Sequence, residues 1–261
     1  MSTGTVPSSP PPKPVSAVWR PDLVRLPRLT WRLRLFRSFI RGLCRLLVFV
    51  CTRATALGLE NYPRSGPALV VINHLGDPDA AVTLAFLPDF PEVIGKIELR
   101  SIPVLGPVMD MLGTIWVHRG QADRRAVSAA LEAFRQGRRL IIAPEGRESL
   151  TGVLEPGTDG AAYLALKTGV PVVPVTLTGT SNRDVYGSLR RLRRAPISLT
   201  VGKPFSLPGA GLREGLAPAE RHAALQEGTR IIMETLASQL PPEYRGVYAY
   251  VGDDPSIPSQ S

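Results

Sequence analysis

The chain has 261 residues and two cysteines, and residues 1–53 carry its whole formal net charge of +9. That part holds ten Lys or Arg and one acidic residue, whereas the remainder holds 21 of each. The length suits one sizeable α/β domain with appendages, and so few cysteines exclude a disulfide-stabilised secreted scaffold. No short apolar core with a cleavage pattern stands near the start, so we expect a protein inside the cell.

Residues 1–28 are basic and rich in Pro and Ser, with too little apolar content to bury, and predict a disordered tail. Residues 29–57 change to a helical pattern with bulky apolar side chains on one face. On the other face, arginines confined to an arc of roughly 80° recur at helical spacing: Arg34, Arg37, Arg41 and Arg45. A helix of this kind is typical of one that lies in the plane of an anionic membrane surface, with its arginines among the headgroups.

An alternative for residues 29–57 is a helix packed on the protein's own core with its arginines in solvent. A spanning helix is disfavoured, because arginines interrupt every window of about twenty residues. Nucleic acid is not an expected partner, because the wide apolar face would stay exposed on DNA. Cys44 and Cys51 would lie two turns apart on this helix, too far for a disulfide.

Strands and helices are predicted to alternate over residues 58–240, which indicates a mostly parallel sheet flanked by helices. The expected strands are 68–72, 113–118, 139–143, 172–178 and 197–201, and the expected helices are 78–87, 122–136, 159–169 and 218–239. Residues 241–261 are predicted to be a tail that wraps the surface or frays.

The segment Asn73–Ala80 carries the most informative pattern. It follows the apolar run 68–72, which places His74 at the carboxyl end of a strand, where sites in open α/β sheets lie. Pro78 suits a first helical turn, and Asp79 would lie inside that turn and reach back to one ring nitrogen of His74. Such a pair can activate a hydroxyl, although the same spacing also occurs in purely structural pairs.

Three further segments carry weaker signals. The turn Pro144–Ser149 follows a strand and offers the Glu145 carboxylate, and a surface turn is its alternative. Arg119 ends an apolar strand and suits bidentate phosphate binding, or else a surface ion pair. Two prolines in Val170–Val175 predict an edge strand, or a strand whose ladder is interrupted beside a pocket.

Taken in order, these four segments resemble the glycerolipid acyltransferase family typified by 1-acylglycerol-3-phosphate acyltransferase, over roughly residues 55–205. The family's Asn-His-x4-Asp block matches Asn73, His74 and Asp79. Its remaining blocks match Gly113, Ile115 and Arg119, then Pro144, Glu145 and Gly146, then Val170, Pro171 and Pro174. The stretch from Lys96 to Pro103 also looks like the family's segment before the second block.

The resemblance implies a transferase of phospholipid biosynthesis that moves a fatty acyl group from acyl-CoA or acyl carrier protein to a lysophospholipid hydroxyl. The expected product is phosphatidic acid, and no cofactor or metal is implied. His74 is then the general base and Asp79 orients it. The resemblance assigns acceptor binding to five residues: Lys96, Arg119, Glu145, Gly146 and Arg147. Backbone N–H groups near Gly146 or at the helix start after His74 would hold the oxyanion.

The third block departs from the family pattern, because Arg147 stands where Thr is usual and Glu148 where Arg is usual. This shifted cation leaves open a different lysolipid or an amino-lipid as the acceptor. A catalytically silent membrane-binding homologue is the other alternative. A metal-dependent hydrolase is disfavoured, since no His-x-x-x-His or Cys-x-x-Cys cluster accompanies His74. We expect a peripheral or monotopic protein at the cytoplasmic face of the cell membrane.

Overall fold

A computed structural model describes residues 13–120, 123–209 and 217–252. Its centre is a seven-stranded sheet of order β1-β7-β6-β2-β5-β3-β4. Neighbouring strands are parallel except β6 and β7, which are antiparallel. The strands are β1 (Thr52–Leu57), β2 (Ala68–Ile72), β3 (Glu92–Lys96), β4 (Ile115–Val117), β5 (Arg139–Ile142), β6 (Val172–Thr178) and β7 (Ala195–Val201). The prediction of a mostly parallel sheet flanked by helices is confirmed.

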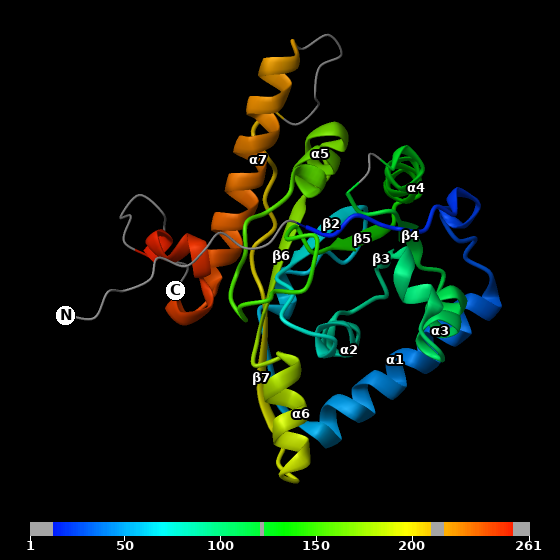
Figure 1. Cartoon of the computed structure of the whole chain (residues 1–261), viewed down its shortest axis with the longest axis vertical. Coiled ribbons are helices and arrows are strands. Elements are labelled where there is room, and N and C mark those ends of the chain that lie inside the picture. The colour runs from blue at the N-terminus through cyan, green and yellow to red at the C-terminus, as the bar shows by residue number, and fades with distance from the viewer. Residues whose placement is uncertain (1–12, 121–122, 210–216, 253–261) are drawn as a thin grey trace.

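Helices cover both faces of this sheet (Figure 1). The helices are α1 (Trp31–Cys51), α2 (Pro78–Phe86), α3 (Leu105–Leu112), α4 (Arg124–Arg135), α5 (Asp159–Thr168), α6 (Asn182–Arg190) and α7 (Pro218–Gln239). Short 3-10 helices lie at Pro21–Leu23, Leu59–Asn61, Ile97–Ser101, Pro242–Tyr244 and Gly246–Gly252. The central strand β2 is buried along its whole length. Its side chains alternate between a core shared with α4, α5 and α7 and a second core shared with α1, α2 and α6.

Several elements differ from the prediction. The helix expected over 29–57 ends at Cys51, and Thr52–Leu57 is an edge strand paired with β7. Short strand β3 and helices α3 and α6 were not predicted, because each is brief and carries Gly or Pro. Strand β6 is not at an edge but lies between β7 and β2. Its ladder with β7 starts at Val175, directly after Pro174, whereas its ladder with β2 runs without a break from Val172 to Val175. The edge position is therefore wrong, and the ladder begins after Pro174 on the β7 side alone.

Helix α1 turns its basic face toward the protein body, which neither expectation for this helix included. Arg37 is buried and forms a two-pronged ion pair with Glu92, with Nη1–Oε1 and Nη2–Oε2 distances of 3.0 and 2.7 Å. Arg41 donates to the carbonyl of Leu87, and Arg45 Nε donates to the Ala85 carbonyl. Arg37, Arg41 and Arg45 therefore fasten α1 to the protein body, and the prediction that the arginines of this arc lie among headgroups or in solvent is wrong for these three. Arg34, the first residue of the arc, remains exposed.

The bulky face of α1 points outward instead. It exposes a ridge, here called the α1 ridge, made of Trp31, Leu35, Phe39, Leu43, Leu46, Leu47, Phe49 and Val50. Trp31 and Phe49, near the two ends of the helix, are 70% and 72% exposed.

Residues 13–28 are not the free tail that their composition predicts. The backbone of Ser16 donates to the carbonyl of Arg119, and the Ser16 hydroxyl accepts from the Arg119 N–H. Arg138 Nη1 donates to the Pro27 carbonyl at 2.8 Å. At the other end, the Tyr244 and Tyr248 hydroxyls accept backbone N–H groups of the domain, so residues 242–252 also pack on it. The predictions for residues 1–12 and 253–261 lie outside the described residues.

Candidate active site

The predicted site residues gather at one edge of the sheet. Strands β2, β3, β4, β5 and β6 are mutually parallel, so their carboxyl ends meet there. Asn73 fixes the first of these ends by bonding across to β6, where its amide accepts from Leu177 N and donates to Leu177 O. The turn carrying His74 is thereby held in place on the sheet.

His74 and Asp79 form the pair that their spacing predicts. The distance from His74 Nδ1 to Asp79 Oδ2 is 2.8 Å, and Asp79 is almost fully buried in the first turn of α2. The same Asp79 oxygen accepts the backbone N–H groups of Leu75 and Gly76 at 2.7 and 3.0 Å. These bonds lock the carboxylate, which in turn fixes the orientation of the imidazole.

The outer edge of the His74 ring is accessible. Its side chain is 33% exposed, and no described residue hydrogen-bonds Nε2. Burial lowers the pKa of His74, but the hydrogen bond and charge of Asp79, assisted by Glu148 and Glu145, outweigh this effect and raise it above its ordinary value. The structure thus offers a basic nitrogen at a strand end with its partner nitrogen occupied.

A second pair with the same spacing serves as an internal comparison. His118 Nδ1 lies 2.6 Å from Asp123 Oδ2, but the His118 side chain is fully buried and its Nε2 accepts the backbone N–H of Arg20. Asp123 also caps α4 through its other oxygen. Because both ring nitrogens are occupied, His118 is a structural histidine, and spacing alone does not distinguish the two pairs.

Glu145 occupies a different position from the one expected. Its side chain is fully buried, Oε1 accepts the backbone N–H of His74 at 2.9 Å, and Oε2 accepts that of Glu155 at 2.8 Å. Burial raises the pKa of Glu145 to about 7, although the two N–H donors oppose that shift. In this geometry Glu145 holds the His74 turn in place and does not reach an acceptor hydroxyl.

Arg147 also points inward. It is buried, and its Nε and Nη2 both lie 2.8 Å from Glu155 Oε2. The phosphate-binding orientation expected of Arg147 is therefore not the one observed. Glu148 faces the site instead: its charge acts on His74, Asp77 and Lys96, and its Oε1 accepts from the Asn182 side chain. The residue exchange in the third block thus replaces a cation with a carboxylate beside the imidazole.

Lys96 and Arg119 are the other two cations expected to bind the acceptor, and both lie at the carboxyl ends of parallel strands. Lys96 ends β3 and pairs in register with Val117 of β4, two residues before Arg119. Both side chains are half-buried, and Arg119 Nε is a buried donor without a partner among the described residues. An unpaired buried donor is costly, and an acceptor phosphate would supply the missing acceptor.

The backbone donors considered for an oxyanion are already engaged. The N–H groups of Leu75 and Gly76 bind Asp79, that of Asp77 binds Asn182 Oδ1, and that of Gly146 binds the Ala143 carbonyl. Gly146 has φ +73°, a conformation that suits glycine. Its role is to form the turn that sends Glu145 inward.

Two neighbours of the site were missed by sequence reasoning. The loop before α6 lies so close to the His74 turn that a Cβ on Gly76 would be 2.8 Å from both Thr180 O and Asn182 N. Lys13 donates to the Pro156 carbonyl, and its charge interacts with Arg147, Glu145 and Glu155. Neither contact has a sequence signal, because each joins segments more than 100 residues apart.

Among the described residues, no group of three or more His, Cys, Asp or Glu side chains is placed to hold a metal ion.

The comparisons with known proteins agree with this geometry. A model of the family described as Acyltransferase matches residues 53–178. A 1-acyl-sn-glycerol-3-phosphate acyltransferase from Salmonella typhimurium is 33% identical over 172 residues, which are 64% of this chain and 67% of that protein. The chain belongs to the Acyltransferase family. The resemblance carried by the four sequence blocks is confirmed.

Plant relatives of this Acyltransferase chain are longer. The chloroplastic 1-acyl-sn-glycerol-3-phosphate acyltransferase of Brassica napus is 34% identical over 178 residues, which are 66% of this chain and 51% of the relative. That of Arabidopsis thaliana is 32% identical, with 66% and 49% covered. The chain therefore spans about half the length of these curated relatives.

A solved structure has the same fold as this Acyltransferase chain. The crystal structure of the 1-acyl-sn-glycerophosphate (LPA) acyltransferase PlsC from Thermotoga maritima aligns with a TM-score of 0.53 at 24% identity. The alignment covers 79% of this chain and 84% of that one. At this identity the likeness shows the fold alone.

Replacing Glu145 by glutamine tests whether this residue positions the His74 turn or binds the acceptor. One of the two N–H groups that Glu145 accepts would then face an NH2 donor, which is expected to lower the free energy of unfolding by about 1–3 kcal/mol. Because the His74 turn shifts, kcat should fall while the KM for the acceptor changes by less than about twofold. Steady-state kinetics and urea unfolding measure both, with exposed Glu60→Gln as control. A large rise in KM at unchanged kcat would restore the acceptor-binding role.

Proposed function

We propose that this protein transfers a fatty acyl group from a thioester, acyl-CoA or acyl carrier protein, to the free hydroxyl of a lysophospholipid. The proposed acceptor is 1-acyl-sn-glycerol-3-phosphate, and the product is phosphatidic acid. The observation that carries the proposal is the accessible Nε2 of His74, with Nδ1 held 2.8 Å from Asp79. The names of the Brassica napus and Salmonella typhimurium relatives support the acceptor.

The chemistry starts with an alcohol that is a poor nucleophile near neutral pH. Nε2 of His74 takes the hydroxyl proton as the acceptor oxygen attacks the thioester carbonyl carbon. Asp79 stabilises the imidazolium that forms. When the tetrahedral intermediate collapses, the carbon–sulfur bond breaks and the imidazolium returns its proton to the thiolate. Since the acceptor attacks directly, no enzyme nucleophile is needed.

Two cations are proposed to hold the acceptor phosphate. Arg119, with its unpartnered Nε, offers charge-assisted hydrogen bonds, and Lys96 adds a second charge from the neighbouring strand. Lys96 ends β3 and Arg119 follows β4, and both strands end at the same sheet edge as β2, which precedes His74.

Incubating purified protein with 1-acyl-sn-glycerol-3-phosphate and either donor, then identifying products by mass, tests the reaction. Formation of phosphatidic acid that depends on His74 is expected. Absence of any acylated lipid with either donor would favour a catalytically silent homologue instead.

The proposal makes a signed prediction for pH. A general base must be unprotonated, so kcat/KM should fall as the pH drops through the raised pKa of His74. The acid limb is therefore expected above the ordinary imidazole value of about 6.5. Asp79→Asn removes the negative charge that helps to raise this pKa, while its amide oxygen can still accept from Nδ1 and burial still lowers the pKa. The limb should therefore move to lower pH as the rate falls. An acid limb that stays in place in the Asp79 variant would assign the titration to another group.

A second acceptor is favoured by one observation. Glu148 stands beside His74 where the family pattern has an arginine, and Arg147 is turned inward. A carboxylate at this point attracts an amine or ammonium and repels a phosphate. Adding amine-bearing lysolipids to the same mass-resolved assay distinguishes the two acceptors.

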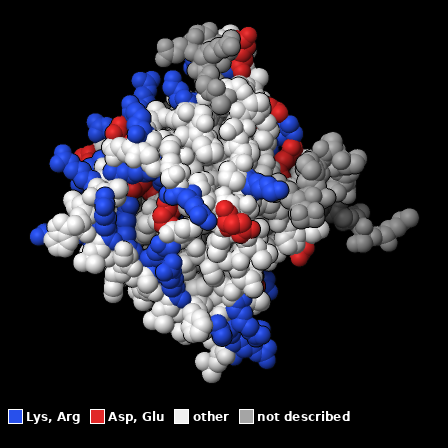
Figure 2. Space-filling model, turned by 180° about the vertical axis from the view of Figure 1, so that it is seen from behind, with Lys and Arg blue, Asp and Glu red and all other residues white. Residues whose placement is uncertain are grey.

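The α1 ridge supports a place at the membrane surface. No helix in the described ranges is both long enough and apolar enough to cross a bilayer. Eight large apolar side chains exposed along one helix form the kind of patch that marks an interaction surface. Leu192, 96% exposed, adds a further apolar side chain among Arg190, Arg191 and Arg193. Arg194 ties this loop to the end of α1 through the Phe49 and Thr52 carbonyls. Figure 2 shows Lys and Arg gathered on the left flank and at the lower tip of the face drawn, with uncharged surface between them.

We infer that the ridge enters the interface while the flanking cations contact anionic headgroups. A peripheral or monotopic position at the cytoplasmic face of the cell membrane is proposed on this basis.

Changing the ridge should release the protein from vesicles. Leu35→Gln, Phe39→Gln and Leu46→Gln together are expected to lower binding to anionic vesicles at least about tenfold, because each side chain loses apolar burial in the interface. Flotation measures the bound fraction. Leu57→Gln, Val247→Gln and Tyr250→Gln, also at exposed positions, form the matched control. Equal flotation of both triple variants would exclude the ridge as the anchor.

A further inference from the structure

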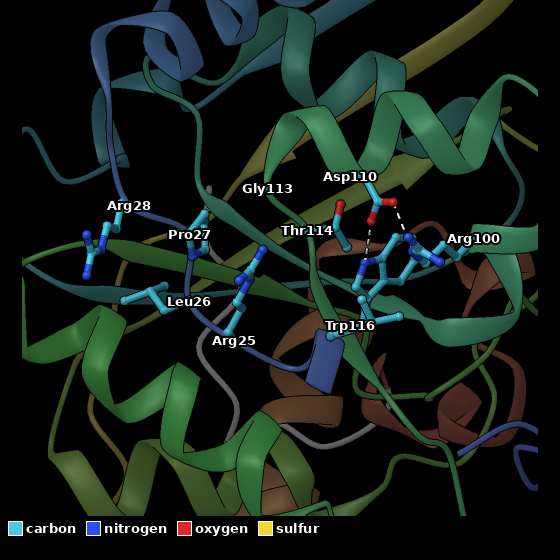
Figure 3. A pocket seen from close by; sticks show the side chains of 10 residues that line it. Arg25, Leu26, Pro27, Arg28, Arg100, Asp110, Gly113, Thr114 and Trp116 are labelled. Carbon is cyan, nitrogen blue, oxygen red and sulfur yellow. Dashed lines mark hydrogen bonds and ion pairs between the residues drawn. The ribbon is translucent and has the colours of Figure 1, made fainter. Parts of the chain in front are cut away.

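A cavity of about 750 Å³ opens on the outer side of the edge strand β4. We call it the edge cavity. Its walls are the segment 23–28 that leads into α1, the end of α3, and β4 (Figure 3). Leu23, Leu26 and Pro27 supply apolar surface together with the ring of Trp116. This volume is in the range of pockets that hold small organic ligands.

The charge of the edge cavity is positive. Arg25, Arg28 and Arg100 line it, against the single carboxylate of Asp110. That carboxylate is fully engaged, since Oδ2 accepts from Arg100 Nε at 2.9 Å and Oδ1 accepts from Trp116 Nε1 at 2.8 Å. Figure 3 draws both bonds and shows Arg25 reaching in from the opposite wall.

Arg25 and Arg28 are left without a counter-ion. No described residue forms a hydrogen bond or an ion pair with either guanidinium. Asp22, whose charge also acts on Arg100, is already paired with Arg20 at 2.9 Å. Both side chains are exposed, and in Figure 3 Arg25 points toward the Arg100–Asp110 pair, whereas Arg28 lies at the far side of the cavity and points away from that pair. Arg25 beside the neutralised Arg100, with Arg28 at the rim, favours an anion with several oxygens such as phosphate.

The edge cavity is separate from the candidate active site. Strand β4 lies three strands from β2 in the sheet order, which corresponds to roughly 14 Å. Gly113 and Thr114 of the cavity precede β4, whereas His74 follows the carboxyl end of β2. A ligand here therefore does not share the position of the acceptor hydroxyl.

The place of the edge cavity in the fold favours a lipid headgroup as the source of the phosphate. Arg28 stands two residues before Thr30, the N-cap of α1, and Trp31 at the helix start is 70% exposed on the α1 ridge. A phosphate in the edge cavity would therefore lie beside the ridge that faces the bilayer. A zwitterionic headgroup is disfavoured, because its ammonium would meet arginines and find no free carboxylate.

We propose that the edge cavity binds the phosphate of one anionic phospholipid, independently of the acceptor site. This inference rests on the membrane position given in the proposed function. The bound headgroup connects segment 23–28 to the bilayer and thereby orients α1 on it.

Calorimetric titration with short-chain lipids tests this binding without vesicles. The probes are dioctanoyl phosphatidylglycerol and dioctanoyl phosphatidylcholine below their micelle concentrations, inorganic phosphate, and coenzyme A. The proteins are the full chain, the variant Arg25→Gln with Arg28→Gln, and a control with Arg32→Gln and Arg34→Gln. The control removes the same charge from exposed positions on α1 outside the cavity.

Saturable binding of phosphatidylglycerol to the full chain and the control is expected, at least about tenfold weaker in the Arg25 and Arg28 variant. Phosphatidylcholine should bind more weakly than phosphatidylglycerol. Equal weakening in both variants would mean general surface charge. Binding of coenzyme A or phosphate that is tighter than that of phosphatidylglycerol, and that is lost only in the Arg25 and Arg28 variant, would assign the cavity to a soluble phosphate. Absence of binding by all four probes would also overturn the proposal. The readout needs no turnover, so failure of the proposed reaction is seen separately.

Discussion

Replacing His74 by alanine is expected to lower kcat by about 10²–10⁴-fold while leaving the free energy of unfolding nearly unchanged. The side chain is one-third exposed, and its only hydrogen bond within the described part of the chain is to Asp79, so its removal costs little packing. The turn itself is held by the Asn73 and Glu145 side chains, which accept backbone N–H groups, and by the Ser149 N–H, which donates to the His74 carbonyl. Turnover and thermal unfolding of the same purified sample measure the two effects together.

His118→Ala is expected to have the opposite effect, a loss of stability without a loss of turnover. Its imidazole is fully buried between Asp123, Trp19 and the Arg20 N–H, so truncation leaves a cavity and unpaired polar groups. We expect a loss of several kcal/mol of stability and near-normal turnover per folded molecule. Exposed His222→Ala should change neither quantity. If His118→Ala removed turnover without destabilising the protein, the two pairs would have to exchange roles.

Replacing Arg37 by methionine is expected to lower the free energy of unfolding by about 3 kcal/mol or more. The change leaves the Glu92 carboxylate buried and without the partner that binds both of its oxygens. Arg37 Nε also donates to the Leu112 carbonyl. Arg138 lies 3.3 Å from Glu92 and retains part of the charge compensation, which places the effect near the lower end of the range for broken buried pairs. Urea unfolding followed by circular dichroism measures the difference.

The matched control is Arg34→Met, on the same helix and exposed, for which a change below about 0.5 kcal/mol is expected. Adding Glu92→Gln to Arg37→Met should restore part of the lost stability, because the unpaired charge is removed. An Arg37 variant as stable as the Arg34 variant would mean that α1 is not fastened to the sheet by this pair.

The main strands and the His74 pair could be predicted because their signals are local. Apolar runs such as Ala68–Ile72 are long and bounded by Gly and Pro, and the helix start after Asp77 places Asp79 within reach of His74. Short elements without such boundaries were missed. Strand β3, for example, contains Gly95 between charged ends and is defined by its pairing with β4 and β5.

The orientation of α1 could not be predicted from periodicity. Helical spacing divides the residues into a basic and an apolar face, but it does not say which face turns inward. The orientation depends on Glu92, which lies 55 residues away from Arg37 in the sequence. Its buried carboxylate forms the ion pair that holds the basic face of α1 inward. Consequently the outward face of α1 is apolar, and the face that holds it to the protein body is basic.

The same limit applies to the third sequence block. The order of Glu145, Arg147 and Glu148 is visible in the chain, but the side-chain directions depend on Glu155 and on the His74 backbone. Two of the side chains expected to touch substrate turn inward, and the unexpected Glu148 turns toward the imidazole. Motif matching located the site and left the roles of these residues to the geometry.

Proton removal by the His74 imidazole is tested most directly by the rate at which the His74→Ala protein forms acylated lipid. The rate is measured at saturating donor and acceptor and corrected for the folded fraction. The ratio to the unmodified protein is expected to be below about 1 in 100. A ratio close to one would contradict the assignment of His74 as the base.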